Sequence, residues 1–254
     1  MNLKPITMER KQFLRNSFGL LSAATIIDAC KKSDITASGT GGSGSGSGSG
    51  SCVITPEEVE GPYPYPGGEM TNPLNRSDVR VISGSTLKTG VLLGLTFTVV
   101  NTNSSCAAVS GARVDIWHCD ARGYYSGYAG QTGADGTQST VGQTWLRGYQ
   151  TTGADGKAAF TTVYPGWYSG RATHIHFEVF VGGVLKKTGQ LTFLESISDA
   201  VHVSAGYTGS VNTTRNSADS IFNNSATDLV NEYAALTGSI AAGYTGTFTL
   251  GIAL

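Results

Sequence analysis

Short apolar runs separated by glycine-rich turns restrict the fold of this chain more than any other feature of its sequence. Residues 91–100 read VLLGLTFTVV, an apolar run rich in β-branched residues and typical of a buried strand. Residues 173–181 and 184–193 flank Gly182 and Gly183, which predicts a β-hairpin. Since such strands do not alternate with helical segments, we expect an all-β protein, an antiparallel β-sandwich with long loops.

Two further segments complete the predicted layout. Residues 146–152 and 158–163 flank the Asp-Gly pair at 155–156, which predicts a second hairpin. Residues 217–236 predict one short C-terminal helix. Its apolar stripe would be formed by Phe222, Leu229, Tyr233 and Leu236.

Few residues of the chain are charged. Charged residues make up 14% of the sequence and the formal net charge is -1, whereas about a quarter of the residues in an ordinary globular protein are charged. A nucleic-acid-binding protein would need a basic patch or stripe, so we expect no nucleic-acid partner. The 35 glycines agree with a β-rich fold that has many tight turns.

The first 30 residues have the features of an export signal. Basic side chains precede a short apolar run at residues 18–27, which is shorter than the roughly 20 residues of a membrane-spanning helix. Residues 27–30 (IDAC) resemble a lipoprotein cleavage box with Cys30 as the lipidated residue, and residues 10–14 (RKQFL) resemble a twin-arginine signal. We expect an exported protein, periplasmic or a cell-envelope lipoprotein, with membrane contact only through Cys30.

A flexible tether and a folded domain follow the signal. Residues 31–51 predict the tether, because they are almost only glycine and serine from position 38 onward. The domain, residues 52–254, contains Cys52, Cys106 and Cys119, and in an oxidising compartment we expect one disulfide and one free thiol. We favour Cys52 with Cys106 because Cys119 lies in an apolar strand, although the sequence leaves the pairing open.

Two histidines two residues apart indicate a metal site. In a strand, His174 and His176 project from the same face, while Ile175 and Phe177 project from the other. Two neutral imidazoles side by side can bind a metal, although such a pair is also common on protein surfaces. Tyr168 lies just upstream in a turn-rich segment, and its phenolate oxygen would suit ferric iron better than zinc.

Three motifs, in this order, resemble the intradiol ring-cleavage dioxygenases, the group that includes catechol 1,2-dioxygenases and protocatechuate 3,4-dioxygenases. They are residues 55–63 (TPEEVEGPY), 114–126 (VDIWHCDARGYYS) and 165–177 (PGWYSGRATHIHF). The resemblance covers roughly residues 52–193. It implies an enzyme that opens a catechol-type ring between its two hydroxylated carbons with O2, giving a muconate-type dicarboxylic acid.

The resemblance also implies a non-haem Fe(III) cofactor and the roles of particular residues. Arg171 matches the arginine that stabilises negative charge on the substrate ring, and Gln190 falls where the family has a polar residue behind the metal ligands. Tyr168 matches the tyrosinate that the substrate displaces. The implied iron ligands are Tyr125, Tyr168, His174 and His176.

Alternatives remain for several of these residues. Tyr124 competes with Tyr125 for the first phenolate, and Tyr164 competes with Tyr168 for the second. His118 reads as a hydrogen-bonded, semi-buried histidine or a neighbour of the ligands. His202 has no partner nearby in sequence, so we expect it at the surface.

The chain also departs from the family pattern. The catechol 1,2-dioxygenase branch has a helical dimerisation region before the sandwich, and the usual proline between the arginine and the first histidine is missing from residues 171–174. The particular catechol and the oligomeric state are therefore open. The alternative function is a non-catalytic, tethered β-sandwich module that binds carbohydrate or phenolic ligands through exposed tyrosines. A zinc hydrolase would need a third histidine or carboxylate ligand that the sequence does not offer convincingly.

Overall fold

The structure is a computed structural model that describes residues 52–254, except 67, 69–73 and 226. The predicted export signal, the lipid site at Cys30 and the tether lie outside the described residues. The described residues belong to one compact unit. In the described part of the chain, no helix combines the length and apolar character needed to cross a membrane.

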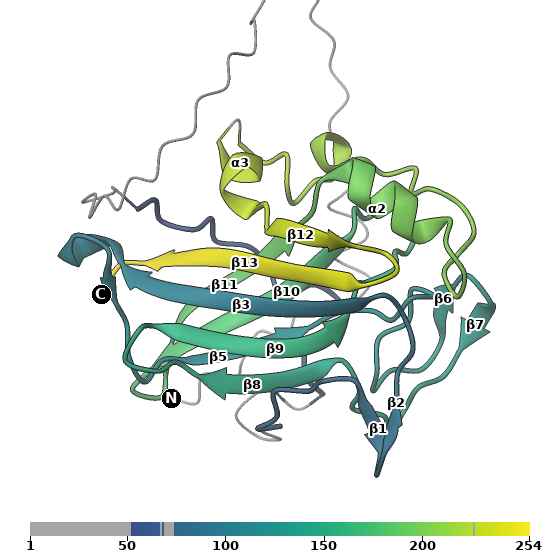
Figure 1. The fold of residues 1–254 in the computed structure, drawn as a ribbon, viewed down its shortest axis with the longest axis horizontal. Coiled ribbons are helices and arrows are strands. Elements are labelled where there is room, and N and C mark those ends of the chain that lie inside the picture. The colour runs from purple at the N-terminus through teal and green to yellow at the C-terminus, as the bar shows by residue number, and fades with distance from the viewer. Residues whose placement is uncertain (1–51, 67, 69–73, 226) are drawn as a thin grey trace, which may run out of the picture. The chain divides into compact units, whose positions relative to one another are not determined.

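Two packed β-sheets form the core of this unit, which confirms the predicted all-β sandwich (Figure 1). One sheet has four strands in the order β11 (Val184–Thr192), β10 (His174–Val181), β5 (Arg113–Trp117) and β8 (Arg147–Thr151). The second sheet begins with β12 (Ala235–Ser239), β13 (Gly243–Ile252) and β3 (Leu92–Asn101). In addition, β3 pairs with β4 (Ala107–Ala108) and β9 (Lys157–Val163). The pairing of β13 with β3 is parallel, and the other pairs in these sheets are antiparallel.

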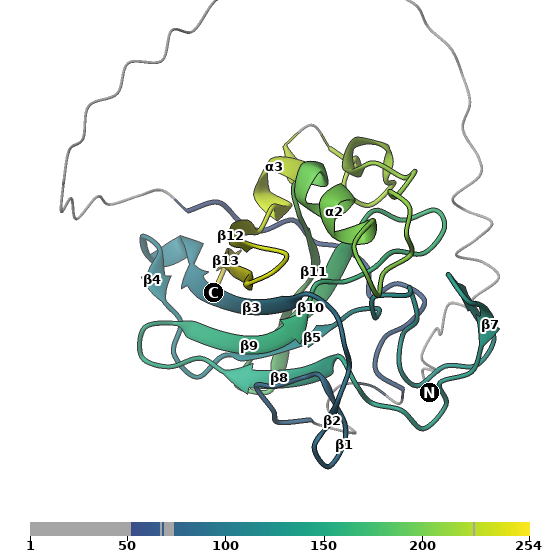
Figure 2. The same ribbon diagram turned by 45° about the vertical axis from the view of Figure 1, so that its right-hand side comes forward.

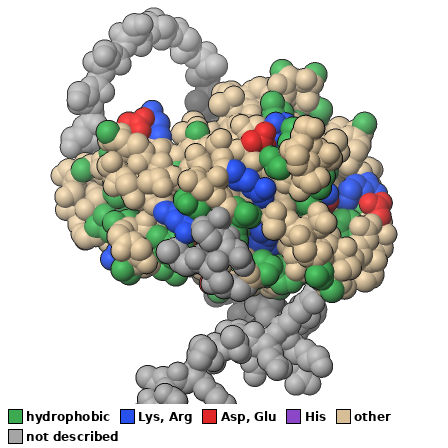
Figure 3. All heavy atoms as spheres, turned by 90° about the horizontal axis from the view of Figure 1, so that it is seen from below, with side chains coloured by type: hydrophobic (Ala, Val, Ile, Leu, Met, Phe, Trp, Pro, Cys, Tyr) green, Lys and Arg blue, Asp and Glu red, His purple; other side chains and the backbone are tan. Residues whose placement is uncertain are grey.

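Short elements surround the sandwich. Two-stranded hairpins are formed by β1 (Val81–Ser83) with β2 (Thr86–Leu87) and by β6 (Gln131–Gly133) with β7 (Gly136–Gln138). The helices are α2 (Glu195–His202) and α3 (Asp228–Glu232), and the 3-10 turns are η1 (Thr102–Ser104) and η2 (Asn216–Ala218). Figures 1 and 2 both place α2 and α3 at the top of the views, at the β12 end of the second sheet. On the face in Figure 3, charged side chains lie scattered among uncharged ones, as the low charge content predicts.

Strand β10 separates the main core from a second aromatic cluster. Its alternating side chains send Ile175 and Phe177 into the core between the sheets, where Phe177 packs on Phe97 and Phe248. The histidines of β10 therefore face away from this core. On that outer face lies a cluster of Tyr65, Trp117, Cys119 and Tyr125, packed against Tyr63, Leu74, Tyr128 and Tyr168.

The predicted hairpin around residues 155–156 is wrong in its pairing. The turn itself forms, with the amide of Gly156 donating to the carbonyl of Gly153, and the two flanking strands exist. However, β8 pairs with β5 in one sheet and β9 pairs with β3 in the other. The Asp-Gly pair specifies a tight turn, but the partner of each strand is fixed by the sheet into which its apolar side chains pack.

The predicted helix at residues 217–236 is also largely wrong. Among its described residues, only Asp228–Glu232 is α-helical; residues 217–218 belong to the 3-10 turn η2, and Leu236 belongs to β12. Polar side chains in this segment bind the backbone in place of helical partners, as when the carboxylate of Asp219 accepts from the amide of Ile221. Helix α2 was not predicted, and it buries His202 completely, so the expected surface position of His202 is wrong.

The favoured disulfide is confirmed. Cys52 and Cys106 are bonded, with their Cα atoms 5.6 Å apart, and Cys119 is a buried free thiol. Burial raises the pKa of the Cys119 thiol far above its usual range, so this thiol is uncharged. The disulfide attaches the start of the described chain to the loop between β3 and β4.

Candidate metal centre

Three of the four predicted ligands meet at one point on the outer face of β10. The Tyr125 hydroxyl oxygen lies 2.9 Å from Nε2 of His174 and 3.1 Å from Nε2 of His176. The two Nε2 atoms are 3.1 Å from each other. Two donors that each lie about 2.1 Å from one ion at a right angle are about 3.0 Å apart. The triangle of donors therefore fits a single metal ion.

Both imidazoles are uncharged, and that of His174 orients a lone pair toward this triangle. The Nδ1 of His174 donates to the carbonyl of Ala172 at 2.6 Å, which leaves Nε2 as the acceptor nitrogen. Burial, together with the charge of Arg171, lowers the pKa of His174 to about 3. Burial and the neighbouring His174 likewise hold the pKa of His176 well below its usual range. Trp117 stacks on His176 with ring centroids 5.0 Å apart and nearly parallel planes, which fixes the ring.

The fourth predicted ligand, Tyr168, brings a buried hydroxyl to the same cluster. Its ring packs edge-on against Tyr125 and His174, with centroids 5.8 and 5.7 Å apart. The hydroxyl is buried within hydrogen-bonding reach of the Tyr125 hydroxyl. Burial raises the pKa of Tyr168 to about 12 and that of Tyr125 well above its usual range. Neither phenol ionises near neutral pH unless a cation is bound beside it.

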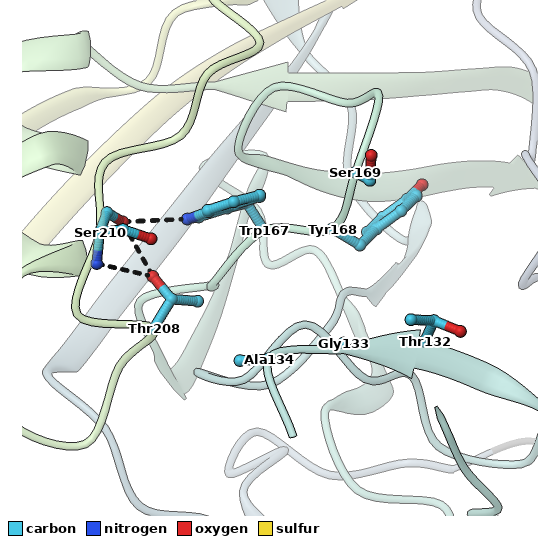
Figure 4. A pocket seen from close by; sticks show the side chains of 8 residues that line it. All are labelled: Thr132, Gly133, Ala134, Trp167, Tyr168, Ser169, Thr208 and Ser210. Carbon is cyan, nitrogen blue, oxygen red and sulfur yellow. Dashed lines mark hydrogen bonds between the residues drawn. The ribbon is translucent and has the colours of Figure 1, made fainter. Parts of the chain in front are cut away.

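A pocket of about 260 Å³ adjoins Tyr168 on its outer side (Figure 4). The ring of Trp167 lies on the opposite side of the view from Tyr168, and its Nε1 donates to the carbonyl of Ser210 at 3.4 Å. The lining carries no charged side chain and consists of Thr132, Gly133, Ala134, Trp167, Tyr168, Ser169, Thr208 and Ser210.

The competing tyrosines lie elsewhere. Tyr124 is a core residue whose hydroxyl donates to the carbonyl of Gly136. Tyr125 is held in the centre by Gln131, whose side-chain oxygen accepts from the Tyr125 amide and whose side-chain nitrogen donates to its carbonyl, both at 2.7 Å. Tyr164 is also in the core, where its hydroxyl bonds to Ser198.

The remaining histidines do not join the centre. Both ring nitrogens of His118 are hydrogen-bonded, one to the carbonyl of Cys119 and the other to Thr162. Of the two predicted alternatives, His118 is therefore the buried, hydrogen-bonded histidine. His202 packs under the loop at Pro165, at whose carbonyl one of its ring nitrogens points.

Arg171 and Gln190 are brought together behind the ligands. The Arg171 guanidinium donates to Asp219 at 2.8 Å and to the side-chain oxygen of Gln190 at 2.7 Å. Gln190 is the cross-strand partner of His176, and its amide nitrogen donates to the carbonyl of Val59. The NH1 of Arg171 is buried and has no hydrogen-bond partner in the described chain. A buried cation with one unused donor is suited to an anionic ligand.

Gly61 and Tyr63 of the EGPY motif cover the centre from the N-terminal side. Tyr63 stacks on Tyr125 with centroids 4.8 Å apart, and its carbonyl accepts from the buried Arg147. Gly61 has φ of +72°, and a Cβ there would lie 3.1 Å from the His176 ring. The glycine and tyrosine of the EGPY motif were visible in the sequence, but their contacts are with residues more than sixty positions away.

The donor set distinguishes between metals. In the part of the chain that the structure describes, no group of three His, Cys, Asp or Glu side chains could hold an ion. A metal at the triangle must therefore be bound by phenol oxygen as well as imidazole. Zinc enzymes rely on histidine, cysteine and carboxylate ligands, so the zinc hydrolase is not supported. Hard phenolate oxygen fits ferric iron.

Comparisons with known proteins agree with this geometry. No protein-family model matches the chain. Catechol 1,2-dioxygenase 1 of Acinetobacter lwoffii is 29% identical over 156 residues, which are 54% of this chain but only 45% of that protein. The chain thus spans less than half the length of this relative.

Solved structures give broader coverage. An intradiol ring-cleavage dioxygenase from Tetranychus urticae superimposes with a TM-score of 0.66 and 27% identity, over 80% of this chain and 95% of the other. The dioxygenase domain of a dioxygenase and carbohydrate-binding protein fusion from Streptomyces sp. SirexAA-E superimposes with a TM-score of 0.55 and 26% identity, over 80% of this chain and 99% of the other. For 3-chlorocatechol 1,2-dioxygenase from Rhodococcus opacus 1CP, the TM-score is 0.51 at 16% identity, over 78% of this chain and 72% of the other. This similarity shows the fold alone. The chain therefore has the fold of the intradiol ring-cleavage dioxygenases, which confirms the resemblance that its three motifs indicated.

Proposed function

We propose that the protein is a non-haem iron(III) dioxygenase that cleaves a catechol-type ring between its two hydroxylated carbons with O2, giving a muconate-type dicarboxylic acid. The observation that carries this proposal is the triangle formed by the Tyr125 oxygen and the Nε2 atoms of His174 and His176, with the Tyr168 hydroxyl beside it. The fold of the chain supports the same reading.

Each residue of the centre would have a definite part in this reaction. Bound ferric iron would supply Lewis acidity that draws electron density out of a catecholate and makes its ring reactive toward O2. Tyr125, His174 and His176 would hold the ion. The Tyr168 phenol oxygen, whose pKa is raised to about 12 by burial, would accept and hold one proton of the incoming catechol.

Arg171 would stabilise negative charge on the ring. Its partnership with Asp219 and Gln190 fixes the guanidinium plane, while NH1 remains available to the substrate. Removing water from around this guanidinium strengthens its interaction with developing charge. The aromatic wall of Tyr63, Trp117 and Tyr125 keeps the centre dry.

The binding-module alternative is weakened by the position of the tyrosines. All 11 tyrosines of the chain lie in its described part, and none of them is exposed: each is buried or half-buried. A surface that recognises sugars or phenols by stacking needs accessible aromatic faces. Most of the tyrosines instead pack in the core or around the proposed centre.

The test is a visible absorption spectrum with iron analysis on the purified protein. Tyrosinate bound to ferric iron gives a broad visible band, and we expect this band to shift when catechol is added under nitrogen. Admission of O2 should then consume the catechol. Protein from iron-replete cells that is colourless and takes up no iron on reconstitution would refute the proposal.

Export is part of the proposal. The signal-like residues 1–30 and the Cys52–Cys106 disulfide support it, because stable disulfides are typical of oxidising compartments. Fractionation of cells expressing the protein should place it in the envelope, and Cys30→Ala should release it from the membrane fraction. Membrane attachment that is unchanged in Cys30→Ala would contradict the lipid anchor.

A further inference from the structure

Residues 52–65 form a strap that runs from the second sheet to the proposed centre. At one end lies the disulfide, followed by a bond from the Thr55 amide to the carbonyl of Gly251 at 3.0 Å. In the middle, the Glu58 amide donates to the carbonyl of Thr188 at 3.0 Å. At the other end, the carbonyl of Val59 accepts from Gln190, and Tyr63 stacks on Tyr125. The position of this strap therefore determines how the centre is covered.

The middle of the strap faces a buried glutamate that the proposed reaction does not use. Glu232, the last residue of α3, is fully buried, and the hydrogen-bond partner of its carboxyl group is the carboxyl group of Glu58. The side chain with the strongest influence on it is Glu58 of the strap, which is itself buried and accepts from the Asn224 amide at 2.7 Å. A buried carboxylate without a donor is costly unless it is protonated.

The charges around the pair favour one shared proton. Glu232 is faced by Glu58 from the strap, by Asp228 from α3 itself and by Asp219 from the segment after η2, all acidic. Glu58 is faced by Asn224 and Asp228 and by the positive charge of Arg171, which is already bound to Asp219. Strand β11, against which the strap packs, contributes the neutral side chain of Gln190, which donates to the Val59 carbonyl, and the ammonium of Lys187, which pairs with Glu57 of the strap.

We propose that Glu58 and Glu232 are positioning residues that share one proton, and that this proton latches the strap to α3 and keeps it seated over the proposed centre. The latch is a property of the described fold and does not require iron. Its effect on ring cleavage rests on the proposed function.

The strap should open more readily as pH rises. Burial, followed by the charges of Glu58 and Asp228, raises the pKa of Glu232 from 4.5 to about 8. A group whose pKa is raised in the closed state favours that state at low pH, and the advantage is lost as pH rises from about 4.5 to about 8. Between pH 6 and pH 9, opening of the strap should therefore increase by a factor on the order of a hundred.

Hydrogen exchange of the Glu58 amide measures this opening without iron or turnover. In the purified protein we expect its protection, corrected for base-catalysed exchange, to fall about a hundredfold from pH 6 to pH 9. Glu232→Gln, which keeps shape and neutrality, should remove most of this fall, and Glu58→Gln serves as a second variant. The matched control is Glu57→Gln, the neighbouring strap residue, whose side chain is 62% exposed and pairs with Lys187. It should respond to pH as the original protein does.

Three results would overturn the latch. Protection that is equal at pH 6 and pH 9 would show that no shared proton holds the strap. A fall in Glu232→Gln as large as in the original protein would assign the pH effect to other groups. Recovery of protection at pH 9 on adding calcium would make the pair a cation site. Failure of the proposed function would appear separately, as protein that keeps this pH response but neither binds iron nor consumes catechol.

Discussion

Gly61 lies so close to His176 that a single methyl group tests the geometry of the centre. At this position φ is +72°, and an alanine Cβ would stand 3.1 Å from Cε1 of the His176 ring. The left-handed backbone costs a non-glycine residue about 1–2 kcal/mol. The contact adds a push on the imidazole, and changes that disturb the orientation of a ligand cost about 10–100-fold in metal affinity.

Gly111→Ala separates the two effects. Its φ of +75° nearly equals that of Gly61, but nothing lies within 4 Å of the added Cβ. Urea unfolding of the iron-free proteins should give a loss of about 1–2 kcal/mol for Gly111→Ala and at least as much for Gly61→Ala. Chelator competition should show the weaker iron binding in Gly61→Ala alone. Equal iron affinity in the two variants would refute the close approach of the strap to His176.

Three other substitutions test separate parts of the structure. Tyr168→Phe should weaken and shift the visible band at equal iron content, because only Tyr125 would remain as a phenolate ligand. Tyr164→Phe, in the same segment but in the core, should leave the band unchanged; equal spectra would remove Tyr168 from the ligand set. Asp219→Asn should lower the free energy of unfolding by about 3–5 kcal/mol, because it leaves the buried Arg171 without its counter-charge; an unchanged urea midpoint would contradict this. Cys52→Ser should cost about 2–5 kcal/mol, measured the same way, and should make thermal unfolding insensitive to reductant.

The parts of the structure that follow from local chemistry could be predicted from the sequence. The two-residue spacing of His174 and His176 places both rings on one face of any strand, and the structure brings both together with Tyr125. The Gly182-Gly183 pair predicted its hairpin, because both residues adopt positive φ there. These features need only a few neighbouring residues to specify them.

Features that depend on distant partners could not be predicted in this way. The turn at residues 153–156 was visible, but the assignment of β8 and β9 to different sheets was not. The burial of Glu232 against Glu58 arises only when segments more than 170 residues apart meet. His202 reads as a surface residue for the same reason, because the loop at Pro165 that covers it is remote in sequence.

The parallel pairing of β13 with β3 has a consequence for how the chain reaches its native state. Residues 243–252 lie in the interior of the second sheet, between β12 and β3, and their partner on β3 is residues 92–101. A ribosome that has made the first two hundred residues has produced a sheet with an open, apolar edge at β3. Closure must wait for synthesis through residue 252, and pairing across so long a separation is slow. Until then the nascent chain depends on something other than its own sheet to cover that edge.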